Sequence, residues 1–115
     1  MPVIDMSELK PVGEFGSSAW GEACAAGAVK ILQAADLPAG TEWGFTEHYT
    51  HPPARLLADG REKAAYFIMV KDGEVTGGDG APEDCLALPG FHISARWAAS
   101  RSRGLQATIP SSFRK

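Results

Sequence analysis

Long apolar runs are absent from this 115-residue chain. No stretch approaches the roughly 18 residues of a membrane-spanning helix, which excludes a membrane span. Cysteine is scarce: Cys24 and Cys85 cannot form a disulfide framework, and this predicts a cytoplasmic protein. The first residues lack the basic and apolar stretches of a secretory signal. With no repeat and no linker rich in glycine, proline or serine, residues 1–115 are expected to form a single small domain.

Acidic residues are missing from the C-terminal part of the sequence. The net charge is −3, yet residues 91–115 contain basic residues and no acid, whereas residues 1–90 contain all 14 acids. A basic end on an acidic body can bind an anionic ligand or an acidic partner, or simply lie on its own acidic surface. Because the chain is acidic overall and carries no recognised nucleic-acid motif, we expect no nucleic-acid partner.

Residues 18–36 have the clearest helical pattern. Ser17 or Ser18 can cap the first turn, and Pro38 stops the helix because proline has no backbone N–H. Small and apolar residues recur at spacings of three and four and form one seam: Trp20, Cys24, Gly27, Ala28, Ile31 and Ala35. The small side chains on this seam allow the helix to pack closely on a sheet.

After Gly40 the apolar period changes to two, which is typical of strands. The pattern predicts strands over 42–51, 64–71, 74–77 and 91–99, with 105–109 as a candidate fifth. Asp72-Gly73 predicts a hairpin between the second and third strands. The expected fold is therefore α+β, with one N-terminal helix packed on a mainly antiparallel sheet of four or five strands.

Glu47 is the first candidate catalytic residue. In a strand over 42–51 its carboxylate shares a face with aromatic rings and with His51. A carboxylate among rings loses hydration, which favours its protonated form and prepares it for general acid–base chemistry. We predict that Glu47 and His51 are catalytic. The alternative is that Glu47 lies at a solvated edge, or pairs with Arg55 or Arg96, and has no catalytic role.

A hydrophobic pocket is predicted around Glu47. Its expected substrate-binding residues are Trp43, Phe45, Tyr49, Trp97, Arg96 and His92. In a strand over 91–99, His92, Ser94 and Arg96 share one face and can hold a carboxylate or phosphate through charge-assisted hydrogen bonds. The alternative is that this face is solvated and binds nothing.

A metal site is not expected. The order Glu47-His48-x-x-His51 differs from the helical His-Glu-x-x-His of zinc proteases, and residues 48 and 51 point to opposite sides of a strand. Gly77-Gly78-Asp79-Gly80 also lacks the order of a phosphate-binding loop. We predict neither a metal nor a cofactor.

Two segments, Phe45–Pro53 and Ala65–Val75, resemble small sterol-carrier-like domains. Those domains have about this length, with an early helix, a strand that ends near prolines and a hairpin at Asp-Gly. The resemblance implies an apolar tunnel between helix and sheet for a lipid or a small hydrophobic ligand. It carries over no functional residue.

Three functions remain open from the sequence. The favoured one is a small cofactor-free enzyme, of isomerase, lyase or cyclase type, that moves a proton on an aromatic or apolar substrate. The second is a non-catalytic carrier in which the same aromatic residues bury a hydrophobic ligand, and Glu47 only orients it. The third is an accessory protein that forms a homodimer through an exposed aromatic strand.

Overall fold

The first helix, α1 (Ser18–Ala34), is capped by Ser17, whose hydroxyl oxygen accepts a hydrogen bond from the backbone N–H of Trp20 at 3.2 Å. The computed structural model describes residues 13–58 and 60–103. The buried side of α1 follows a spacing of four through Trp20, Cys24, Ala28 and Leu32. Ile31, predicted on the buried seam, is 37% exposed, because the spacing of four continues to Leu32 instead.

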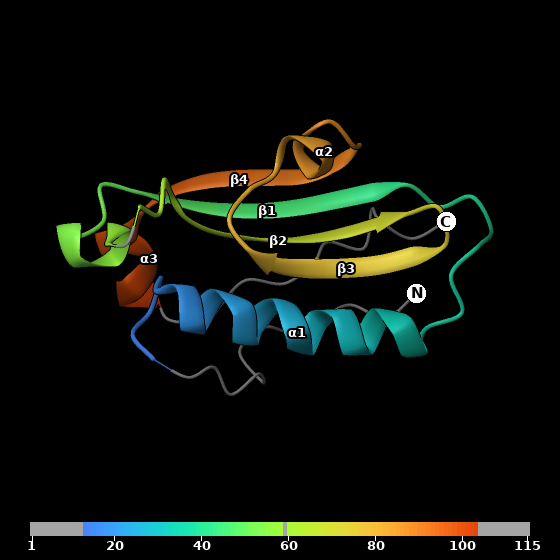
Figure 1. The fold of residues 1–115 in the computed structure, drawn as a ribbon, viewed down its shortest axis with the longest axis horizontal. Coiled ribbons are helices and arrows are strands. Elements are labelled where there is room, and N and C mark those ends of the chain that lie inside the picture. Colours follow the sequence, from blue (N-terminus) through green and yellow to red (C-terminus); the bar gives the residue numbers. More distant parts are fainter. Residues whose placement is uncertain (1–12, 59, 104–115) are drawn as a thin grey trace.

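Four strands follow, in a sheet whose order is β3-β2-β1-β4 (Figure 1). They are β1 (Trp43–Thr50), β2 (Ala64–Lys71), β3 (Glu74–Asp79) and β4 (Gly90–Arg96). The predicted α+β fold with one N-terminal helix on the sheet is confirmed. The sheet is mixed, however: β4 pairs parallel to β1, while the other two pairings are antiparallel. The chain crosses the sheet between β3 and β4, so that β4 runs in the same direction as β1.

Three short helices complete the described structure: η2 (Ala54–Leu57), α2 (Glu83–Leu86) and α3 (Trp97–Arg103). The strand predicted over 91–99 is wrong in its last three residues, since Trp97 begins α3. The candidate strand over 105–109 lies outside the described residues. None of the helices in the described part of the chain is long and apolar enough to cross a membrane.

The sheet has a different helix on each face. On one face α1 packs against β2 and β3, as Figure 1 shows. On the other face α2 lies over β1 at Gly44, where a Cβ atom would approach the Cys85 carbonyl oxygen to 2.5 Å. Glycine at position 44 therefore permits this close contact. We call the two sides of the sheet the α1 face and the α2 face.

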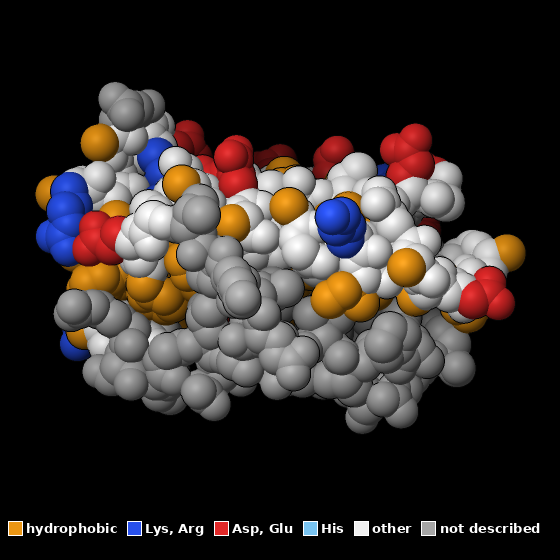
Figure 2. Space-filling model, turned by 90° about the horizontal axis from the view of Figure 1, so that it is seen from below, with side chains coloured by type: hydrophobic (Ala, Val, Ile, Leu, Met, Phe, Trp, Pro, Cys, Tyr) orange, Lys and Arg blue, Asp and Glu red, His pale blue; other side chains and the backbone are white. Residues whose placement is uncertain are grey.

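The core lies between α1 and the sheet and is rich in aromatic rings. Trp20 contacts both Tyr49 and Tyr66 edge to face, with ring centroids 5.8 and 5.6 Å apart. Phe15 contacts Trp20 and Tyr49 from the loop before α1. Seen from below, hydrophobic side chains gather on the surface at the end where η2 and α3 lie (Figure 2).

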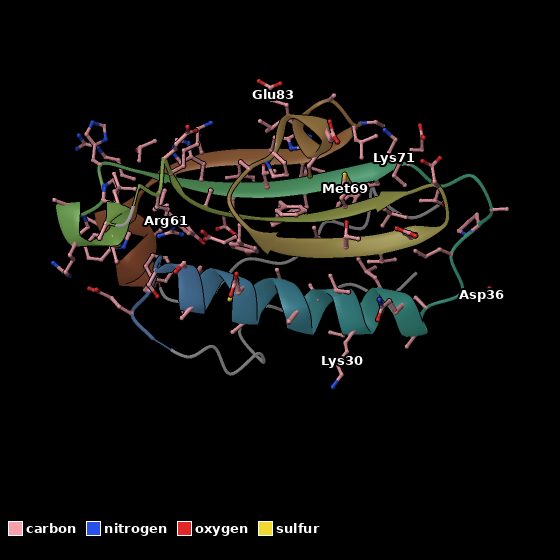
Figure 3. The ribbon with its side chains drawn as sticks, in the orientation of Figure 1. Lys30, Asp36, Arg61, Met69, Lys71 and Glu83 are labelled. Atoms are coloured by element: carbon pink, nitrogen blue, oxygen red, sulfur yellow. The ribbon has the colours of Figure 1, made fainter. Side chains whose placement is uncertain are left out.

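Arg61 precedes β2 and lies at one end of the sheet, near η2 and α3 (Figure 3). It connects its own segment to the loop before α1, to η2 and to β3. Its guanidinium group forms a bidentate ion pair with Asp79, at 2.6 and 3.1 Å, and donates to the backbone carbonyls of Gly16 and Leu56 at 2.7 and 2.8 Å. The Arg61 side chain is only 11% exposed. A partly buried guanidinium group with this many acceptors serves the fold, and the sequence pattern gave no indication of it.

Candidate functional site

Glu47 lies in the middle of β1, on the α1 face. The alternation of β1 places Trp43, Phe45 and Tyr49 on the same side, and all three are buried. The strand register puts Glu47 opposite Tyr66 of β2 on one side and opposite Ile93 of β4 on the other. The Glu47 side chain itself is half-buried. Its carboxylate is thus close to aromatic rings and still partly open to solvent.

Two tyrosines interact with this carboxylate. The Tyr66 hydroxyl donates a hydrogen bond to Glu47 Oε2 at 2.9 Å. Tyr49 lies two residues from Glu47 on the same face of β1, where the negative charge of Glu47 acts on its hydroxyl group. Burial, followed by the negative charge of Glu47, raises the pKa of both Tyr49 and Tyr66 above 10.0. Both phenols therefore remain protonated at neutral pH, and Tyr66 acts as a hydrogen-bond donor to the Glu47 carboxylate.

Cys24 of α1 is a further buried group on this side of the sheet. Burial, with a contribution from Glu47, raises the pKa of the Cys24 thiol to about 12. A thiol in this state is a poor nucleophile and acts as a small apolar side chain in the core. Cys85 of α2 is also buried on the other face, and burial raises its pKa too. Neither cysteine has the properties of a reactive site.

His51 does not share the site with Glu47. β1 ends at Thr50, and His51 is exposed, with a left-handed φ of 56°. The prediction extended the strand by one residue at this end, so it placed His51 on the Glu47 face. Because the backbone turns at His51, ahead of Pro52, the alternation of the strand no longer applies there. The predicted catalytic pair of Glu47 and His51 is not assembled.

The predicted anion-holding residues lie on the α2 face, away from Glu47. His92, Ser94 and Arg96 pair with Thr46, His48 and Thr50 of β1, which all point to the side opposite Glu47. His92 Nε2 donates to the Leu88 carbonyl oxygen at 2.9 Å, and its Nδ1 lies 3.0 Å from Thr46 Oγ1. His92 therefore ties β4 to β1 and to the preceding loop. Neither His92 nor Arg96 can hold a substrate against Glu47.

Trp97 is buried, but as the first residue of α3 rather than on a strand. Its Nε1 donates to the Phe15 carbonyl oxygen at 2.9 Å, and its ring contacts the Phe15 ring. A homodimer through an exposed aromatic strand would need the rings of β1 at the surface, but Trp43 and Tyr49 are 5% and 2% exposed. These aromatic residues therefore form the core, and they offer no surface to a second copy.

Tyr66 is the site residue that the sequence analysis missed. It lies in the nearly continuous apolar segment of β2, a pattern that by itself predicts only core positions. A phenol in a central strand is itself a signal, since a buried hydroxyl requires a hydrogen-bond partner. The identity of that partner depends on the register between β1 and β2, which no local pattern provides.

The apolar surface next to Glu47 comes from β4. Phe91 and Ile93 pair with Phe45 and Glu47 and lie on the α1 face. Ile93 is 39% exposed and Phe91 is half-buried, whereas α1 packs mainly on β2 and β3. We call Glu47 with Tyr49, Tyr66, Phe91 and Ile93 the β1–β4 site. It combines one anchored carboxylate with apolar side chains that are still accessible.

A separate cavity of about 540 Å³ lies at the other end of the sheet. It is formed by the last turn of α1, the connection over 35–41 and the β2–β3 hairpin, with Leu32 and Val70 among its apolar lining residues. Val70 pairs with Trp43, four residues from Glu47 along β1, or about 13 Å. This cavity is therefore distinct from the β1–β4 site.

Neither a metal centre nor a relative identifies the chain. Among residues 13–58 and 60–103, no group of three or more His, Cys, Asp or Glu side chains is placed to hold a metal ion. Comparisons with protein-family models, curated proteins and solved structures find no match. The geometry of the sites themselves therefore indicates the function.

Proposed function

We propose that this protein binds a small hydrophobic molecule at the β1–β4 site and acts as a carrier or binding protein. The observation that supports this is the Glu47 carboxylate, held by the Tyr66 hydroxyl beside the exposed Ile93 side chain. An apolar surface with one well-placed polar group is typical of small-molecule sites. Both cysteines are free, which fits a reducing cytoplasmic compartment.

The chemistry of Glu47 indicates which ligand head group fits. A carboxylate accepts hydrogen bonds and donates none, and the Tyr66 hydroxyl donates one to Glu47. A ligand hydroxyl group is a donor of the same kind. A ligand carboxylate would be repelled, and Arg96 lies on the opposite face. The proposed ligand is therefore an apolar molecule that carries a hydroxyl group, not the carboxylate considered at first.

The favoured function from the sequence, general acid–base catalysis by an isomerase or lyase, is the second candidate. The partial exposure of Glu47 supports it, because a substrate proton can reach the carboxylate. The raised pKa of Tyr49 and of Tyr66 makes each tyrosine a weaker acid, so neither is suited to return a proton to a substrate. This favours an orienting role for Glu47 over a catalytic one.

Binding of 1-octanol, with octanoate as the chain-matched anion, tests the proposal. The backbone amide signals of β1 and β4 are followed by NMR during each titration. We expect octanol to shift the signals of Glu47 and Ile93, and octanoate to bind at least tenfold more weakly. Glu47→Gln should weaken octanol binding about fivefold, because a hydrogen bond to a neutral acceptor is weaker than one to a charged acceptor. Glu42→Gln, an exposed position before β1, is the control and should bind as wild type does.

Other outcomes would reject the proposal in distinct ways. Equal binding of octanol by Glu47→Gln and wild type would remove Glu47 as the anchor. Shifts confined to residues 35–41 and the β2–β3 hairpin would place the ligand in the separate cavity. A substrate that wild type converts, and that Glu47→Gln binds but does not convert, would establish the enzyme. A homodimer that Ile93→Lys dissociates would assign the exposed β4 surface to self-association.

A further inference from the structure

The α2 face carries a group of polar and basic side chains that the proposed function does not use. His48 and Thr50 of β1 pair with Ser94 and Arg96 of β4, so all four lie on this face. Lys63 directly precedes β2, and β2 pairs with β1 so that Ala64 is opposite Tyr49. Lys63 therefore lies next to Thr50, and both line the same small concavity as His48. We call these five residues the basic cluster: His48, Thr50, Lys63, Ser94 and Arg96.

His48 is in contact with one member of the basic cluster and close to another. Ser94 Oγ lies 3.2 Å from His48 Nδ1. His48 and Lys63 line the same small concavity, and burial, with the positive charge of Lys63, lowers the pKa of His48. With Nδ1 directed at Ser94, the Nε2 atom of His48 is the ring nitrogen that remains to face a ligand.

A small concavity adjoins the basic cluster. Its volume is about 190 Å³, and its lining residues include His48, Thr50 and Lys63, together with His51 and Glu62. A small oxyanion fits this volume. Glu62 is the acid among the lining residues, whereas His48, His51 and Lys63 all present nitrogen donors.

The two cations of the basic cluster are not engaged by carboxylates of the described residues. Within residues 13–58 and 60–103, the ion pairs join Arg55 to Glu14 and Arg61 to Asp79, and neither includes Lys63 or Arg96. Two cations gathered on one surface of a chain with a net charge of −3 repel each other unless an anion compensates them. Charge and geometry thus both favour an anionic ligand at this position.

We propose that the basic cluster is a binding site for a small oxyanion, namely a phosphate group, free or as part of a larger ligand. Lys63 and Arg96 supply the positive charge, and His48 Nε2 supplies a hydrogen-bond donor. The Ser94 hydroxyl donates to His48 Nδ1, which leaves the ring proton on Nε2, and the Thr50 hydroxyl donates to the Ala95 carbonyl oxygen. His92 was predicted as part of this set, but its ring is engaged by Thr46 and Leu88, and His48 takes its place. The site lies on the opposite face from Glu47 and does not depend on the proposed hydrophobic ligand.

An NMR titration of the full chain with inorganic phosphate tests this assignment, with chloride used to hold the ionic strength constant. We expect phosphate to shift the amide signals of His48, Lys63 and Ser94 in a saturable manner. Removing one charge by Lys63→Gln or Arg96→Gln should weaken phosphate binding about fivefold, the factor expected for one charge pair near a solvated surface. Both side chains are exposed, so these variants should keep the wild-type fold and spectrum.

Lys30→Gln is the matched control, because Lys30 projects from α1 away from the sheet (Figure 3). It should bind phosphate as wild type does. If phosphate shifts none of the cluster signals, or if Lys30→Gln weakens binding as much as Lys63→Gln, the site does not exist as proposed. In a parallel titration, acetate should bind more weakly than phosphate, because it carries less charge and fewer acceptors. Equal or tighter binding of acetate would overturn the choice of phosphate.

Discussion

The hydrogen bond between Tyr66 and Glu47 is the contact on which the candidate site depends, and its contribution to stability can be measured. Tyr66 is 1% exposed, and its hydroxyl donates to a carboxylate that is half-buried. A hydrogen bond to a charged group contributes about 1.5–3 kcal/mol. Because water can still reach part of Glu47, we expect the lower end of this range. Tyr66→Phe should therefore destabilise the fold by about 1.5 kcal/mol, or roughly 6 °C in Tm.

Changes at Glu47 separate the hydrogen bond from the charge. Glu47→Gln keeps an acceptor oxygen for Tyr66 and should cost less than 1 kcal/mol. Glu47→Leu leaves the buried Tyr66 hydroxyl without this acceptor, which costs about 1–3 kcal/mol. When Tyr66→Phe is added to Glu47→Leu, no hydroxyl is left unsatisfied, so the double variant should be more stable than the sum of the two single losses predicts.

Urea denaturation of wild type, Tyr66→Phe, Glu47→Leu and the double variant provides the required cycle. We expect a coupling energy of about 1 kcal/mol or more between the two positions. Purely additive losses, within about 0.5 kcal/mol, would show that the two side chains do not interact in solution. The β1–β4 site would then lack its anchor, and the reasoning about Glu47 would be refuted.

Two further predictions concern pH and the ion pair at the end of the sheet. Since the pKa of Tyr49 and of Tyr66 in the folded state lies above 10.0, their contribution to stability is complete below pH 10 and is lost as the pH rises towards the folded values. The urea midpoint should thus fall steeply with pH above about pH 10. This fall should be less steep for Tyr66→Phe than for wild type. Equal slopes would contradict the raised pKa of Tyr66. Arg61→Met should cost about 3–5 kcal/mol, because Asp79 and two backbone carbonyls lose their donor. A loss below about 1 kcal/mol, typical of surface ion pairs, would show that the Arg61 network is solvated.

The secondary structure could be predicted wherever a local period was strong. The spacing of small residues located α1, and alternation over 43–50 correctly placed Glu47 on the side of Trp43 and Phe45. Errors appeared at the ends of elements. β1 ends at Thr50, one residue before the predicted end, and β4 is followed by α3 at Trp97. The end of a strand depends on where its hydrogen bonds to the adjacent strand stop, and a local pattern does not show this.

The partners of the site residues could not be predicted, because they depend on contacts between distant parts of the chain. Alternation predicts which residues share a face within one strand. It does not predict which residues of two strands lie opposite each other, because that depends on how the strands pair. Because β4 pairs with β1 in this register, Arg96 lies on the face opposite Glu47, and Ser94 lies next to His48.

The sequence by itself determined the elements and the orientation of Glu47, since helix and strand periods are properties of neighbouring residues. Only the tertiary structure decided that Tyr66 donates to Glu47, that Arg61 pairs with Asp79, and that the basic cluster assembles on the other face. The physical reason is that these contacts join residues 18 to 46 positions apart, and their geometry is fixed only when the strands pair and the helix packs.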